Sequence, residues 1–74
     1  MNKGLKNIVG DNIKKYRKQL GISQEELAER AGLHRTYIGS VERGERNITL
    51  DSLQVIASAL NIPFMKLLME EADV

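Results

Sequence analysis

Hydrophobic residues recur at helical spacing in several separate stretches of the chain. In the first stretch they lie four, four, three and four residues apart, at Leu5, Val9, Ile13, Tyr16 and Leu20. This spacing puts them on one face of an α-helix. Gly21 can take the left-handed conformation that ends a helix, so the pattern predicts a helix over 5–20. Gly10 inside it should cost roughly 1 kcal/mol relative to alanine.

The second stretch opens with a helix start signal, Ser23-Gln24-Glu25-Glu26. Ser23 can accept from the free N–H groups of the first turn, and Glu26 can reach back to the N–H of Ser23. One face of the helix then carries Leu27, Ala28 and Ala31. Gly32 can end this helix with a positive φ. A short helix over about 24–31 is expected.

A third short helix should begin near His34 and end at Gly44. Ile38 and Val41 are expected to face inward, and Leu33 closes the preceding turn. The outer face carries donors and small residues without an acid: Arg35, Thr36, Gly39, Ser40 and Arg43. Such a face can lie in a DNA groove, where its N-terminal side chains reach base edges.

Two further helices are expected after residue 48. Thr49 can cap the fourth, Asp51 lies favourably in its first turn, and Asn61 can cap its end. The predicted inner stripe of this helix is Leu50, Leu53, Ile56, Ala57 and Leu60. Pro63 suits the first position of a fifth helix running to about Glu70.

The fifth helix would be apolar around most of its circumference. One stripe can close the core, and the remainder would be an exposed apolar patch of the kind that marks interaction sites. We interpret it as a homodimer interface formed by Phe64, Met65, Leu67, Leu68 and Met69. The alternative is that all of these residues belong to the core. Residues 71–74 should form a frayed acidic tail.

Length and composition predict one small domain over residues 1–74. The chain has no cysteine, no apolar run near the ~20 residues of a membrane span, and no signal-peptide core, so we expect a cytoplasmic protein. With one histidine and no glycine-rich phosphate loop, we expect no enzyme, metal, cofactor or small-molecule effector.

Charge is distributed unevenly, although the net charge is only +1. Residues 1–46 hold ten of the eleven Lys and Arg residues and six of the ten acids. Phosphate binding requires such a basic region around the second and third helices. An ordinary solvated surface with uneven charge is the alternative explanation.

The second and third helices resemble the helix-turn-helix of the phage-repressor/Cro-type family, also called the XRE family. The matching residues are Gln24, Ala28, Gly32, Ile38, Val41, Glu42 and Gly44. The similarity covers about residues 10–62. It implies an all-α fold of five short helices, like the lambda-repressor DNA-binding domain, and double-stranded DNA as the partner.

The resemblance also implies roles for single residues. Arg35, Thr36 and Ser40 fall where family members read base edges. Arg35 is the strongest candidate, because its guanidinium can donate to O6 and N7 of one guanine, worth about 1–3 kcal/mol of discrimination. The family often has Gln at such positions, so the target of this chain should differ.

Backbone contacts are expected from Gln24, His34, Tyr37, Arg43 and Arg46. Four of them have an ordinary alternative: His34 could cap the third helix or have no special role, Tyr37 could pack over that helix, and the two arginines could be solvated.

Arg17 could contact a phosphate as well. The resemblance favours instead a structural ion pair between Arg17 and Glu42, which would tie the first helix to the end of the third.

Within the family, the segments RTYI, ERGERNIT and SLQVIASAL most resemble the controller proteins of restriction-modification systems. Those are stand-alone dimers that bind upstream of their own gene and the endonuclease gene. The resemblance implies a homodimer on a palindromic operator, with half-sites ~34 Å apart. RNA polymerase is a further possible partner, through Glu25, Glu26 and Glu29 on the second helix.

An antitoxin or protein-interaction module on the same fold is the alternative function. An antitoxin would usually bring an extra toxin-wrapping segment, and none is evident.

Overall fold

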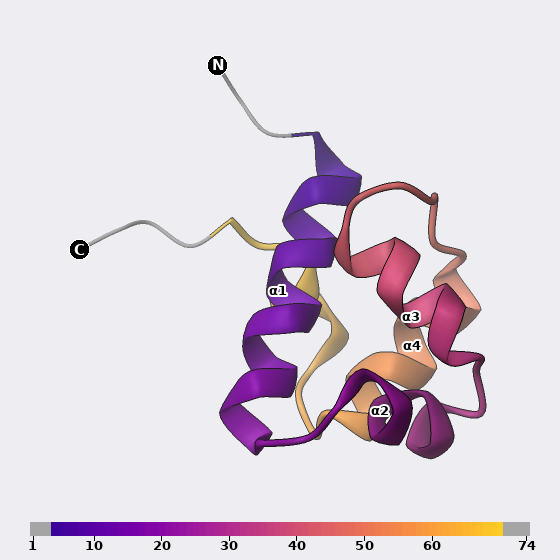
Figure 1. Cartoon of the computed structure of the whole chain (residues 1–74). Coiled ribbons are helices and arrows are strands. Elements are labelled where there is room, and N and C mark those ends of the chain that lie inside the picture. Colours follow the sequence, from indigo (N-terminus) through magenta and orange to yellow (C-terminus); the bar gives the residue numbers. More distant parts are fainter. Residues whose placement is uncertain (1–3, 71–74) are drawn as a thin grey trace.

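The computed structural model describes residues 4–70, which form four α-helices and a short 3-10 turn (Figure 1). The elements are α1 (Leu5–Leu20), α2 (Gln24–Ala31), α3 (Arg35–Glu42), α4 (Leu50–Ala59) and η1 (Phe64–Leu67). The predicted all-α fold is confirmed, and no strand occurs within residues 4–70. None of the helices in this range is long and apolar enough to cross a membrane.

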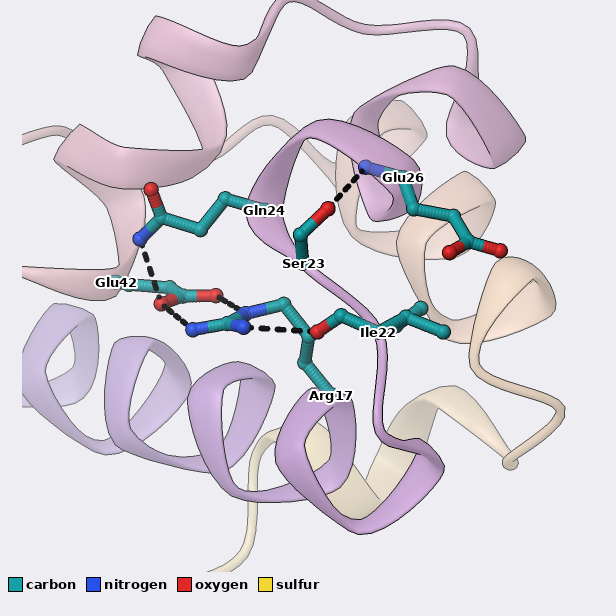
Figure 2. A network of polar contacts seen from close by, with 6 residues as sticks. All are labelled: Arg17, Ile22, Ser23, Gln24, Glu26 and Glu42. Atoms are coloured by element: carbon teal, nitrogen blue, oxygen red, sulfur yellow. Dashed lines mark hydrogen bonds and ion pairs between the residues drawn. The ribbon is translucent and has the colours of Figure 1, made fainter.

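Local signals explain where the helices begin and end. The hydroxyl of Ser23 accepts from the N–H of Glu26, and that of Thr49 from the N–H of Ser52, both at 3.0 Å. Gly21 and Gly32 follow α1 and α2 with φ of 71°. The predicted reach of Glu26 back to Ser23 is wrong, because the carboxylate of Glu26 points away from Ser23 (Figure 2). It pairs with Arg30 instead, at 2.6 Å.

The core gathers residues from all four helices and from η1. Its buried members are Val9, Ile13, Ile22, Leu27, Ala28, Ile38, Val41, Leu53, Ile56, Ala57, Leu60 and Leu67. Three residues expected on inner stripes are instead exposed: Leu5, Leu20 and Leu50. Leu5 and Leu20 are the terminal residues of a 16-residue helix, and the eight-residue α2 and α3 are too short to cover its full length. Leu50 is likewise the first residue of α4.

The fifth helix predicted over 63–70 is wrong, because this segment forms only the 3-10 turn η1. Pro63 is extended, with φ −62° and ψ 140°, and precedes the turn. The carbonyls of Leu67 and Met69 accept hydrogen bonds from the side chain of Asn12 in α1, each at 2.9 Å. These carbonyls therefore find their donor in another element of the fold. In Figure 1 the segment passes beside α1.

Gly10 lies where α1 crosses the C-terminal end of α3. A Cβ at this position would stand 2.8 Å from the carbonyl oxygen of Glu42 and closer still to that of Val41. Both neighbours are backbone atoms, which cannot turn aside as a side chain would. The glycine that weakens α1 as an isolated helix is therefore what allows α1 and α3 to approach.

We expect Gly10→Ala to destabilise the protein, although alanine is the better helix former by roughly 1 kcal/mol. Overpacking against backbone should cost about 1–3 kcal/mol, and each kcal/mol lowers the Tm of a domain this size by about 4–8 °C. Thermal unfolding followed by circular dichroism measures the change.

Gly39→Ala is the matched control for this prediction. The atoms nearest its Cβ would be the exposed end of the Arg43 side chain, at 3.2 Å, and the Gln24 side chain, at the ordinary contact distance of 3.4 Å, so its Tm should stay the same or rise. An unchanged or higher Tm for Gly10→Ala would contradict the packing argument.

Candidate nucleic-acid interface

Helices α2 and α3 form a helix-turn-helix, with the turn at Gly32 and Leu33 (Figure 1). Ile38 and Val41 of α3 are buried in the core. Arg35 and Thr36 on the same helix are exposed, and Ser40 is half-buried. The helix therefore separates an apolar face, which fixes its position, from a polar face that is free to meet a ligand.

One hollow lies between the polar face of α3 and the start of α2. It has a volume of about 200 Å³ and is lined by Gln24, Arg35, Thr36, Gly39 and Arg43. Two of these residues carry guanidinium groups and none is an acid. Gly39 contributes no side chain, which leaves room for the ends of Gln24 and Arg43 above it. The hollow is suited to an anionic group such as a phosphate.

A second hollow lies on the other side of α3, with a volume of about 360 Å³. Its lining residues are Leu33, His34, Thr36, Tyr37, Ser40, Arg46 and Ser52. The guanidinium of Arg46 lies 5.4 Å from the centre of the Tyr37 ring, within the range of a cation–π contact. This contact places the loop after α3 beside the polar face. Thr36 lines both hollows, so it lies on the ridge between them.

Ser40 and His34 make fewer of the possible hydrogen bonds than their side chains would allow. The Ser40 hydroxyl donates to the carbonyl of Tyr37 at 2.9 Å, which leaves its oxygen free only to accept. His34 occupies the N-cap of α3 through its backbone, and its side chain makes no capping hydrogen bond. His34 is exposed and lines the second hollow.

A buried polar network holds the helix-turn-helix against α1 (Figure 2). Arg17 donates to both oxygens of Glu42, from Nε at 2.6 Å and from Nη2 at 3.0 Å. Its Nη1 donates to the carbonyl of Ile22 at 2.9 Å. Arg17 therefore forms the structural ion pair with Glu42 that the resemblance implies. The hydrogen bonds to Glu42 raise the pKa of Arg17, against a lowering by burial, so the guanidinium stays charged.

Gln24 joins this network from the first residue of α2. Its amide nitrogen donates to Glu42 Oε1 at 3.0 Å. The same amide lines the first hollow, so Gln24 connects the buried ion pair to the polar face of α3. From the sequence we expected Gln24 to bind a phosphate and did not predict this bond, since residue spacing does not reveal a contact across 18 positions.

Arg43 is paired with Glu45 across 3.1 Å, a contact that the sequence analysis missed. Both side chains are more than half exposed, at 59% and 58%. An exposed pair of this kind contributes little to stability, so Arg43 can leave Glu45 for a phosphate.

The segment expected to form the dimer interface divides into buried and exposed residues. Leu67 is fully buried and Leu68 packs against the core. Phe64, Met65 and Met69 are exposed, at 45%, 61% and 53%. Assigning Leu67 to the interface is therefore wrong, because its whole surface is already covered within the chain.

Comparisons with known proteins agree with this geometry. A family model described as helix-turn-helix matches residues 13–67. The control protein C.SmaI of Serratia marcescens is 56% identical over 64 residues, covering 86% of this chain and 76% of that protein. The control protein C.BamHI of Bacillus amyloliquefaciens is 38% identical over 63 residues, 84% of this chain and 78% of that protein.

A solved structure is similar over the same region. The restriction-modification controller protein C.AhdI of Aeromonas hydrophila superposes with a TM-score of 0.82 at 40% identity, covering 84% of this chain and 94% of that chain.

Breaking the Arg17–Glu42 pair should reduce stability before it reduces intrinsic DNA affinity. Arg17→Ala and Glu42→Ala each leave one buried charge without its partner, at a cost of about 3–5 kcal/mol. Thermal melts, together with DNA binding measured well below the reduced Tm, test this. Arg30→Ala, which breaks the exposed pair with Glu26, should change the Tm very little. Normal stability with lost binding would instead make Arg17 a phosphate contact.

Proposed function

The chain belongs to the helix-turn-helix family of DNA-binding transcriptional regulators, and from this premise we propose that it is a restriction-modification controller protein that binds a palindromic operator as a homodimer. The observation that carries the proposal is the acid-free polar face of α3, bordered by two hollows that contain Arg35, Arg43 and Arg46. As a DNA-bound regulator it would act in the cytoplasm.

Arg35, Thr36 and Ser40 are the proposed base readers. Arg35 and Thr36 are exposed in the first turn of α3, the part of a recognition helix that enters the major groove. The Arg35 guanidinium has the fork of donors that matches guanine O6 and N7. Because the Ser40 proton is held by Tyr37, Ser40 would accept from an amino group of adenine or cytosine.

The proposed backbone contacts border these base readers. Gln24 and Arg43 line the first hollow, and His34, Tyr37 and Arg46 line the second. Each hollow would receive a phosphate of one strand as α3 enters the groove. The half-buried hydrogen bond between Gln24 and Glu42 would hold the first of these contacts in place before DNA arrives.

The homodimer is proposed from the need for specificity and from the exposed apolar residues. An eight-residue recognition helix reads only a few base pairs, whereas two copies on a two-fold axis read a palindrome. Phe64, Met65 and Met69 offer exposed apolar surface within one short segment, with half-buried Leu68 between them. Such surface is the kind that a second copy covers in a symmetric dimer.

RNA polymerase is the further partner that we propose for an activating role. Glu25 and Glu29 are exposed on α2, whereas Glu26 is paired with Arg30. These acids lie on the helix beside the recognition helix, where a DNA-bound polymerase subunit could reach them.

Sequence selection from a random DNA pool, at near-physiological salt, tests the operator and the role of Arg35 together. Wild type should enrich a palindrome with a preferred guanine in each half-site. Arg35→Ala should relax that preference, with a loss of about 1–3 kcal/mol on the preferred site. Arg35→Lys is the matched control, because it keeps the charge and loses the planar fork, so it should also relax the preference.

If wild type enriches no sequence and binds DNA weakly and only through salt-sensitive contacts, the operator proposal is wrong. A stable complex with another protein in a pull-down would then favour the antitoxin or interaction-module function.

Arg43→Gln and Arg46→Gln should weaken binding to all DNA sequences about equally. Each removes one phosphate contact, so the slope of log K against log salt should decrease by about 1. Titrations at several salt concentrations, on the selected site and on an unrelated duplex, measure this. Arg30→Gln, the same change at an arginine outside both hollows, should leave the slope unchanged. A loss confined to one sequence would make the residue a base reader.

A further inference from the structure

Asn12 is a buried polar residue in the middle of α1, with only 6% of its surface exposed. Its amide nitrogen donates to the carbonyl of Leu67 and to the carbonyl of Met69, both at 2.9 Å. Both hydrogens of the amide are therefore used on one segment that is 55 and 57 residues away in the sequence. The network around Arg17 and Glu42 does not include this side chain.

The segment that Asn12 holds is short of hydrogen bonds of its own. η1 has four residues, and its last bond runs from the N–H of Leu68 to the carbonyl of Met65 at 3.0 Å. The buried side chain of Leu67 fixes the segment from one side, and the amide of Asn12 fixes its backbone on either side of Leu68. Together they fix the backbone from which the exposed side chains of Met65 and Met69 project.

We propose that Asn12 is a positioning residue for self-association: it presets residues 64–69 as the surface that binds a second copy of this chain. This inference rests on the homodimer proposed above. Phe64, Met65 and Met69 supply exposed apolar area on this surface. The segment also carries one cation, Lys66, and is followed by an acid, Glu70, both exposed.

Charge complementarity favours a second copy as the occupant. A two-fold axis brings the same segment of both chains together, so Lys66 of each copy can meet Glu70 of the other. The segment is then complementary to itself in charge as well as in its apolar residues. Methionine side chains can adapt their shape across such a contact.

The physical consequence is preorganisation. A segment that is already fixed loses little conformational entropy when it binds, whereas a loose one must be ordered at the expense of affinity. Loss of the Asn12 hydrogen bonds should therefore weaken dimerisation, while the helix-turn-helix, held by Arg17 and Glu42, keeps its structure.

The test compares dimerisation of wild type, Asn12→Asp and Asn12→Leu by sedimentation equilibrium, at a temperature where circular dichroism shows each variant folded. Asn12→Asp keeps the size and removes the amide donors, and Asn12→Leu keeps the branched shape while replacing the polar group with a somewhat larger apolar one. We expect the dimer Kd to rise tenfold or more in both, equivalent to 1.4 kcal/mol. Binding to a duplex with a single half-site should stay within twofold of wild type.

Two matched controls separate this role from general stability. Gln19→Glu makes the same amide-to-acid change at an exposed position of α1. Ile56→Val weakens the core without touching the Asn12 hydrogen bonds. Both should dimerise within twofold of wild type, although Ile56→Val lowers the Tm. If the Asn12 variants dimerise like wild type, or if Ile56→Val weakens the dimer as much as they do, the inference is wrong.

Hydrogen–deuterium exchange of the wild-type chain tests the same point if neither Asn12 variant folds. The amide of Leu68 should stay protected when the dimer is diluted into monomers, because the segment is fixed in advance. Protection that vanishes with dissociation would overturn the inference.

A wild-type chain that stays monomeric at every concentration overturns the homodimer itself, whereas Asn12 variants that dimerise with unchanged affinity overturn only the role of Asn12.

Discussion

The buried ion pair between Arg17 and Glu42 is the interaction on which the arrangement of the helices depends. Arg17 lies in the last turn of α1 and Glu42 is the last residue of α3, and their side chains are 10% and 2% exposed. Two charges removed from water are stable there because each of their polar atoms has a hydrogen-bond partner: the three nitrogens of Arg17 donate to Glu42 and Ile22, and the two oxygens of Glu42 accept from Arg17 and Gln24. One pair thus connects α1, the loop after it, the start of α2 and the end of α3.

The polar network and the backbone packing at Gly10 both hold α1 against α3. The absent Cβ lets α1 approach the carbonyls of Val41 and Glu42, and the ion pair fixes the helices near that crossing. Their combined effect is to hold α3 with its apolar side in the core and Arg35 and Thr36 outside. A recognition helix can discriminate between base pairs only if its side chains arrive in a fixed register, so a rigid support for α3 would serve the DNA-binding function proposed for it.

Residues 64–69 are held against α1 by other contacts than the Arg17–Glu42 pair. Its carbonyls are satisfied by Asn12 rather than by a continuing helix, and Leu67 is its anchor in the core. The helix-turn-helix and the proposed dimer surface therefore both depend on α1, but through separate residues. Such a separation would allow subunit association to change without changing how one copy reads its half-site.

The sequence alone determined the all-α fold, the ends of α1 and α2, and the inward positions of Ile38 and Val41, because capping residues and helical periodicity act over a few neighbouring positions. Its resemblance to a known family supplied Arg17 and Glu42 as a pair. Tertiary structure decided what depends on distant neighbours. Leu50 is exposed because no element among residues 4–70 covers the start of α4. Residues 64–67 form a 3-10 turn whose last carbonyl, that of Leu67, accepts from Asn12 in α1. Gly10 is needed because α3 passes close to it. A pattern of neighbouring residues cannot predict these features. Two of them arise from contacts between residues more than 30 positions apart, and the exposure of Leu50 arises because such a contact is missing.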